Sequence, residues 1–136
     1  MKIKERDRRF LRMKGSLTDL NDRFSHFAGT EHYYSHLIRT CVFTDGVKAM
    51  ADQYQAYWLI DVVVSYQMTK RIKCIPFQIW RINSTEGKVV IEMRQDIDQP
   101  VLVRQQIPFT DFPEGSLQLY CIDDSECKVI LLPSEY

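Results

Sequence analysis

Residues 88–107 have the sequence KVVIEMRQDIDQPVLVRQQI, which contains the clearest strand pattern in the chain. In its first half, Val89, Ile91 and Met93 alternate with side chains that are mostly charged, a period of two that is typical of a strand with one packed and one solvated face. The DIDQP segment in the middle is rich in turn-forming residues. A connection of this length is too short for a crossover helix, so the two halves are predicted to form an antiparallel hairpin.

The loop of this hairpin also predicts its register. A five-residue loop from Asp96 to Pro100 places Gln95 opposite Val101, and therefore Glu92 opposite Arg104. Opposite charges directly across a hairpin contribute only about 0.2–1 kcal/mol. We therefore expect this pair to select the register more than it stabilises the sheet.

The second half of the chain repeats this strand pattern, whereas the first half has helical spacing. Strands are predicted at 76–82, 88–95, 101–107, 116–122 and 128–132. A first helix is predicted at 16–27, a helical turn followed by an extended piece at 30–43, and the clearest helix from Thr44 onward. These patterns predict an α+β fold, with N-terminal helices packed on one face of a C-terminal antiparallel sheet of about five strands.

The segment Tyr57–Tyr66 leaves an alternative open. It is apolar nearly all round, so its periodicity does not separate a buried helix from a buried strand, and only its nearness to the preceding helix favours a helix. Asp61 lies inside this segment. Because a buried carboxylate is costly unless it is paired, we expect Asp61 to be a structural anchor with a polar partner, and an active-site acid is the alternative.

Length and composition fit a single globular domain. The 136 residues are 45% hydrophobic and 26% charged, and 18 basic side chains balance 18 acidic ones. Residues 1–14 hold seven Lys/Arg and two Asp/Glu, a net charge of +5. We expect this basic segment to be flexible and residues 15–136 to form the domain. No apolar run is long enough for a signal peptide or a membrane span, so the protein is expected to be cytoplasmic.

The cysteines and histidines favour no metal site. The four cysteines form no CxxC pair and are expected to be reduced. On a helix, His32 and His36 would share one face, where Glu31 or Cys41 could complete a metal site. Since Glu31 precedes both histidines, however, the sequence has no HExxH motif. We expect neither a metal nor a cofactor.

Five blocks of sequence occur together: GTEHYY (29–34), TDGVK (44–48), AYWLID (56–61), TDFP (110–113) and LPSEY (132–136). Their order and spacing resemble an uncharacterised family of small bacterial proteins, one of the domain-of-unknown-function families found in mobile and phage-like gene neighbourhoods. The resemblance covers roughly residues 17–136 and implies a bacterial cytosolic protein with no assigned activity. If the family has a functional surface, the blocks place it at Glu31, Tyr34, Asp45, Trp58, Asp61 and Asp111.

Folding alone accounts for much of these blocks, because Asp45 suits a helix cap and Asp111 suits a turn. We therefore predict a non-enzymatic binding or accessory protein that works through protein–protein association. A sheet face that carries Trp80, Val90, Leu102 and Tyr120 would be unusually apolar for a solvated face, which predicts a homodimer. The alternatives are nucleic-acid binding through the basic N-terminus, and an enzyme or metal-dependent domain that uses Glu31, His32, His36 and Asp61.

Overall fold

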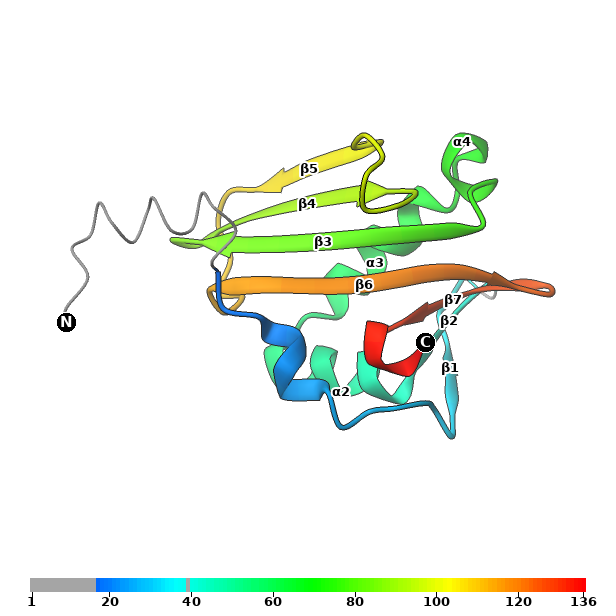
Figure 1. Cartoon of the computed structure of the whole chain (residues 1–136), viewed down its shortest axis with the longest axis horizontal. Helices are drawn as coiled ribbons and strands as arrows, with labels where there is room; N and C mark the ends of the chain where they lie inside the picture. The colour runs from blue at the N-terminus through cyan, green and yellow to red at the C-terminus, as the bar shows by residue number, and fades with distance from the viewer. Residues whose placement is uncertain (1–16, 39) are drawn as a thin grey trace.

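The computed structural model describes residues 17–38 and 40–136, in which seven strands form one sheet (Figure 1). The basic segment at 1–14 lies outside the described residues. The strands are β1 (Tyr33–Ser35), β2 (Cys41–Thr44), β3 (Phe77–Thr85), β4 (Lys88–Arg94), β5 (Val103–Ile107), β6 (Gly115–Asp124) and β7 (Cys127–Leu131). Their order across the sheet is β1-β2-β7-β6-β3-β4-β5, and all neighbours are antiparallel except β2 and β7, which are parallel.

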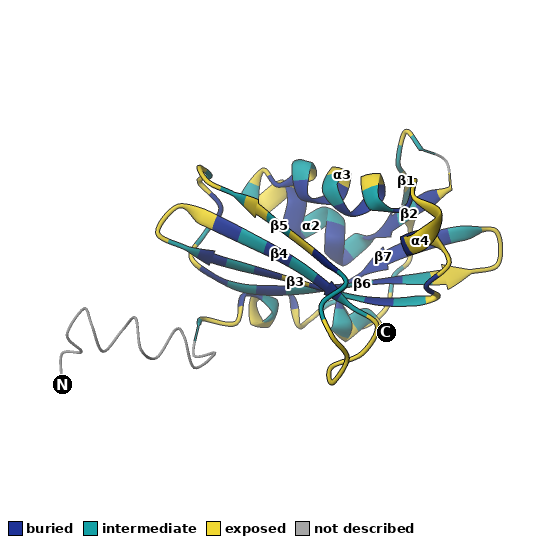
Figure 2. Cartoon of the chain, turned by 90° about the horizontal axis from the view of Figure 1, so that it is seen from above, coloured by how far each residue is buried: buried dark blue, intermediate teal, exposed yellow. Residues whose placement is uncertain are grey.

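Two α-helices form a layer on one side of this sheet. The α-helices of the described chain are α2 (Asp45–Tyr54), α3 (Tyr57–Tyr66) and α4 (Lys70–Lys73), and its 3-10 helices are η1 (Leu20–Phe24) and η2 (Pro133–Glu135). Figures 1 and 2 show α2 and α3 on one face, with η2 on the opposite face, called the open face below. Within residues 17–38 and 40–136, no helix is long and apolar enough to cross a membrane.

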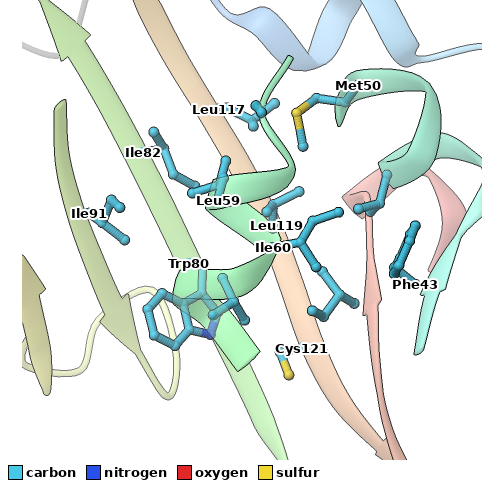
Figure 3. Close-up of a cluster of buried hydrophobic side chains, with 14 of the residues drawn as sticks. Phe43, Met50, Leu59, Ile60, Trp80, Ile82, Ile91, Leu117, Leu119 and Cys121 are labelled. Atoms are coloured by element: carbon cyan, nitrogen blue, oxygen red, sulfur yellow. The ribbon is translucent and has the colours of Figure 1, made fainter. Parts of the chain in front are cut away.

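The core lies between α2, α3 and the sheet because each strand turns alternate side chains toward the helices. In Figure 3, Trp80 and Ile82 of β3, Ile91 of β4 and Leu119 of β6 gather around Leu59 of α3. All five are fully buried. Burying one large apolar side chain stabilises the fold by about 1.5–3 kcal/mol, so a strand slipped by one residue would lose several such contributions.

The hairpin predicted from residues 88–107 is confirmed. β4 and β5 are antiparallel, and Glu92 pairs with Arg104 as the loop length predicts. The Arg104 Nη1 atom lies 3.2 Å from Glu92 Oε2. Local turn length and alternation were sufficient here because both strands are neighbours in sequence.

The α+β class is also confirmed, but two details of the predicted architecture are wrong. The sheet has seven strands rather than about five, and the helices are not clearly N-terminal because β1 and β2 precede them. The additional strands are β1 and β2, in the region where a helical turn followed by an extended piece was predicted at 30–43; β1 replaces the helical turn, and β2 agrees with the extended piece. β2 forms part of the sheet by pairing with the distant β7, and no local pattern in the sequence shows such a pairing.

The helix predicted at 16–27 is also wrong, since only Leu20–Phe24 forms a 3-10 helix. The segment before it runs beside β6, where the Ser116 N–H donates to the Thr18 carbonyl oxygen at 2.7 Å. The Asn21 side chain then makes two hydrogen bonds to the backbone of Gln118. Its Nδ2 donates to the Gln118 carbonyl oxygen, and its Oδ1 accepts from the Gln118 N–H. Pairing with a distant strand therefore replaces the first turn of the predicted helix.

The segment Tyr57–Tyr66 is a helix, which resolves the alternative in favour of the predicted one. It follows Gln55, whose backbone is left-handed with φ 49°, so the chain reverses between α2 and α3. Its buried residues are Leu59, Ile60, Val63 and Val64. This spacing gives one packed side toward the sheet and leaves the opposite side to solvent.

The apolar face predicted from Trp80, Val90, Leu102 and Tyr120 does not exist as one surface. Trp80 is fully buried in the core, and Leu102 packs against the same core. Tyr120 pairs with Ile79, the neighbour of Trp80, and therefore faces the opposite side of the sheet. Only Val90 and Tyr120 of the four belong to the open face.

Candidate functional site

The N-terminus of α2 is where three of the five sequence blocks meet. Thr44 precedes the helix with extended backbone, and its Oγ1 accepts from the Val47 N–H at 3.4 Å. The same hydroxyl donates to Glu135 Oε1 at 2.6 Å. We call this place the α2 corner; it joins residues 29–34, 44–48 and 132–136.

Asp45 attaches the loop before β1 to this corner. Its Oδ2 accepts from the backbone N–H groups of Glu31 at 2.9 Å and His32 at 3.3 Å, and its own N–H donates to Thr30 Oγ1 at 2.9 Å. The pKa of the Asp45 carboxyl is held below its usual range, mainly because the Glu31 N–H donates to it. The carboxylate is therefore a structural acceptor for the loop before β1, whereas the helix cap that the sequence suggested for Asp45 is supplied by Thr44.

Tyr34 completes the set of donors around Asp45. Its hydroxyl donates to Asp45 Oδ1 at 2.9 Å, and this hydrogen bond is the main reason that the pKa of Tyr34 is raised. The Tyr34 ring stacks on Phe43 with centroids 5.7 Å apart, and Lys48 Nζ lies 5.6 Å from the ring centroid. A hydroxyl with a raised pKa that already donates to a carboxylate is a poor candidate for acid–base chemistry.

Glu135 bonds the first turn of α2 from a position far along the chain. Its Oε2 accepts from the Gly46 N–H at 3.0 Å, and its Oε1 accepts from the Leu132 N–H at 2.9 Å as well as from Thr44. A carboxylate at a helix N-terminus is stabilised by the helix dipole. Glu135 was missed as a site residue, although the LPSEY and TDGVK blocks contain both partners of this contact.

A second hydrogen-bonded group lies on the outer side of α2 and α3. Lys48 Nζ is 2.8 Å from Asp52 Oδ2, and the Tyr57 hydroxyl donates to Asp52 Oδ1 at 2.5 Å. These contacts lower the pKa of Asp52, chiefly through Lys48, and raise the pKa of Lys48 and Tyr57, chiefly through Asp52. None of the three was predicted, although Lys48 and Asp52 lie four residues apart on α2; only Tyr57 comes from the second helix, α3.

Asp61 is not buried, so the prediction of a buried anchor is wrong. Its side chain is 67% exposed, because it lies on the solvent side of α3. It nevertheless has a partner, since its Oδ1 lies 2.7 Å from His36 Nε2. The other ring nitrogen of His36 accepts from the Ile38 N–H at 3.0 Å, which assigns the ring proton to Nε2. Both nitrogens are thus engaged, and the ring offers no free base.

The remaining candidates do not join these groups. Trp58 is half-buried and meets the ring of Phe112 edge-on, with centroids 6.0 Å apart. Asp111 is exposed in the TDFP segment, where the hydroxyl of Thr110 rather than Asp111 bonds the following backbone. Of the six predicted side chains, Tyr34 and Asp45 meet directly, and Glu31 joins them only through its backbone.

The metal hypothesis loses its geometric basis because His32 and His36 flank strand β1 rather than lie on a helix. His32 Nδ1 lies 3.6 Å from Asp45, whereas His36 contacts Asp61 on α3. Among the described residues, no three His, Cys, Asp or Glu side chains are grouped so that they could hold a metal ion.

A groove on the open face lies beside the α2 corner and was not predicted. It has a volume of about 340 Å³, and its floor is formed by Ile122, Val129 and Leu131. Tyr33 and Tyr136 also line it, and their exposed fractions are 58% and 71%. We call it the tyrosine groove; its remaining lining residues are Gly29, Thr30, Thr44, Asp124 and Glu135.

The aromatic surface continues from this groove onto the centre of the open face. The rings of Phe77, Tyr120 and Tyr136 form a cluster with centroid separations of 5.0 Å, 5.3 Å and 5.8 Å. Phe77 and Tyr120 are half-buried, and each comes from a central strand of the sheet. The two strands and the C-terminal segment therefore bring together three rings from distant parts of the sequence.

A family model described as a family of unknown function, DUF6876, matches residues 18–136. The chain belongs to this family. The match confirms the predicted resemblance to a family of unknown function. Comparison with curated proteins finds no match.

One solved structure is similar to this DUF6876 chain. It is described as the crystal structure of a protein of unknown function from Enterococcus faecalis, with a TM-score of 0.53 and 21% sequence identity. The match covers 74% of this chain and 93% of that chain. At this identity the likeness concerns the fold alone.

Proposed function

We propose that this protein is a non-enzymatic binding module that associates with another protein through the tyrosine groove. The observation that supports the proposal is the pair of largely exposed tyrosines, Tyr33 and Tyr136, beside an apolar floor. Tyrosine is enriched at protein interfaces because it combines a large apolar ring with a hydrogen-bonding hydroxyl. Two such side chains around one groove are typical of an interaction surface.

The chemistry of the groove indicates the kind of segment it would accept. A volume of about 340 Å³ is near the lower end of ligand pockets and suits one or two side chains. The floor is apolar, and the exposed carboxylate of Asp124 lies among the lining residues. The partner we propose is a protein segment that places an apolar side chain between the tyrosines and a basic side chain near Asp124.

The polar groups of the α2 corner support a binding role rather than catalysis. At this corner Asp45 already accepts from three donors. Outside the corner, next to β1, both ring nitrogens of His36 are engaged as well. A general base requires a free lone pair within reach of the substrate proton. Asp45 holds the loop before β1 in place, and the contacts of Glu135 hold η2, so the α2 corner shapes two walls of the groove.

Selection of random peptides on the immobilised protein tests this proposal. The selected peptide, made synthetically, is titrated against the wild type, a Tyr33→Ala/Tyr136→Ala variant and a control, Tyr57→Ala, which removes an exposed tyrosine on the helix side. We expect the peptides to combine an apolar and a basic residue, and the double variant to bind about tenfold or more weakly, as for a loss of about 1.4 kcal/mol.

Circular dichroism establishes that all three proteins are folded. Equal affinity of the wild type and the double variant, or repeated selections that enrich no peptide, would overturn the proposal. Loss of peptide binding in Tyr57→Ala alone would also overturn the proposal, because this result would place the binding surface on the helix layer.

A further inference from the structure

The outer edge of β5 is free of any strand or helix in the described part of the chain. β5 is the last strand in the sheet order, and Figures 1 and 2 show its outer side uncovered. The backbone of the preceding residue, Leu102, is already used, because its N–H donates to the Met93 carbonyl oxygen and its carbonyl oxygen accepts from Arg71. The available edge therefore begins at Val103.

This edge lacks the usual protection against pairing. Natural edge strands are commonly short, or carry lysine or proline. β5 has five residues and contains neither lysine nor proline, and its one charge, Arg104, is paired with Glu92 inside the chain. The opposite edge of the sheet, β1, has only three residues.

The sequence of β5 is complementary to itself when two copies run antiparallel. With a two-fold axis at Gln105, Val103 lies opposite Ile107 of the second copy, and Arg104 lies opposite Gln106 of the second copy. Gln105 then faces Gln105 across the axis, where each Oε1 already accepts from the Tyr66 hydroxyl of its own copy at 2.8 Å. No like charges are placed opposite each other, and the apolar residues pair at both ends.

The same register gives a place for the most exposed phenylalanine of the described chain. Phe109 follows β5 and is 90% exposed. Across the two-fold axis it would lie opposite Val101 of the second copy. A cavity of about 400 Å³ lies at the next residues of the chain, Leu102 to Arg104, between β5 and the end of the helix layer. Its other lining residues are Tyr66, Thr69, Arg71 and Ile72.

We propose that two copies of this chain pair their β5 edges antiparallel around Gln105, with Phe109 of each copy in the β5-side cavity of the other. The arrangement is closed, because both copies use the same surface. It joins two seven-stranded sheets into one. It also leaves the tyrosine groove free in each copy, since the groove lies toward the other end of the sheet. The inference is therefore independent of the proposed function.

Sedimentation analysis of the full chain from about 5 to 100 μM tests the dimer, since a modest interface of this kind is expected to have a micromolar dissociation constant. We expect the mass to rise from 16.1 kDa toward twice that value. Gln106→Lys would place a lysine of each copy opposite Arg104 of the other. These two like-charge pairs should raise the dissociation constant about tenfold. Gln106→Glu should lower it, and Phe109→Ala should raise it.

The matched control is Gln118→Lys, which makes the same charge change on β6, away from the edge, and should leave the dissociation constant unchanged. A mass of 16.1 kDa throughout the concentration range would overturn the proposal. So would a dimer that responds equally to Gln106→Lys and Gln106→Glu, or one that Tyr33→Ala/Tyr136→Ala dissociates instead.

Discussion

Gly46 shows how closely the C-terminal segment approaches α2. A Cβ atom on this residue would lie 2.7 Å from both Glu135 Oε1 and Leu132 Cδ1. The Glu135 carboxylate cannot move away without losing its hydrogen bonds to the Gly46 N–H and the Thr44 hydroxyl. Glycine is required here by space, because nothing wider fits between the helix and the segment that bonds it.

Gly46→Ala is expected to lower the free energy of unfolding by about 1–3 kcal/mol, as for other overpacked sites. The sign is informative, because alanine is normally favoured over glycine within a helix by about 1 kcal/mol. Denaturant unfolding monitored by circular dichroism measures the change. In a Glu135→Ala background the loss should be smaller, since one of the two obstructing groups is gone. A neutral or stabilising Gly46→Ala would show that the segment does not pack there.

Asp45 is expected to make stability depend on pH at the acidic end. Its folded-state pKa is depressed, so its contribution is fully present above the unfolded value of about 3.9 and is lost as the pH falls through the folded pKa. Asp45→Asn should therefore be less stable than the wild type at pH 7, and the difference should shrink as the pH falls below about 4. Asp111→Asn, at an exposed aspartate, is the control. A difference that is constant with pH would contradict the assigned role of the charge.

At the scale of elements, one buried amide joins α3, α4 and β3. The two N–H groups of Gln78 Nε2 are shared among three acceptors at 2.8–3.1 Å, the carbonyl oxygens of Ile72 and Ile75 and the Oε1 of Gln67. The Gln78 Oε1 accepts from Trp80 Nε1 at 3.0 Å. Because Gln78 is fully buried, water cannot replace its hydrogen bonds to the Trp80 N–H and to Gln67 Oε1.

Gln78→Leu keeps the approximate size of the side chain but leaves the Trp80 N–H and the Gln67 amide oxygen without this partner. The carbonyl oxygens of Ile72 and Ile75 keep other donors, the Ile75 N–H and Lys128 Nζ. We expect a loss of about 2–3 kcal/mol in the free energy of unfolding, since an unsatisfied buried group costs about 1–3 kcal/mol. Gln118→Leu, on the open side of β6, should change stability by less than about 0.5 kcal/mol. Thermal and denaturant unfolding of the two variants compare them directly, and equal effects would exclude a special role for the buried amide.

Across the whole molecule, burial divides the four cysteines into two classes. Cys41 and Cys121 are buried, whereas Cys74 is exposed and Cys127 is partly exposed. Burial in the core raises the pKa of the Cys121 thiol to about 12, so very little thiolate forms at neutral pH. The buried thiols therefore report on global unfolding.

A thiol reagent at neutral pH should label Cys74 first and Cys127 more slowly in the folded protein, while Cys41 and Cys121 react only in denaturant. Mass spectrometry of the labelled peptides at successive times identifies each site. Cys74→Ser should remove the fast phase and leave the others unchanged. Rapid labelling of Cys121 in the folded protein would show that the core opens far more readily than the packing implies.

The hairpin of β4 and β5 and the helix Tyr57–Tyr66 were predictable because their patterns are local. Alternation and loop length specify which residues of a hairpin face each other. Nearness to the capped helix α2 favoured a helix at 57–66, although α3 is a separate helix. The family resemblance also followed from blocks visible in the sequence. The hairpin and the helix each depend on one continuous stretch of the sequence.

The α2 corner, β2 and the tyrosine groove were decided only by the tertiary structure, because their partners lie far apart in the chain. β2 is a strand because β7 lies beside it, and Glu135 bonds the first turn of α2 from 91 positions beyond Thr44. Asp61 lies within an apolar segment, yet it faces solvent because the helix turns its other side to the sheet. Composition shows that a residue can be buried, but only packing determines which side of an element is covered.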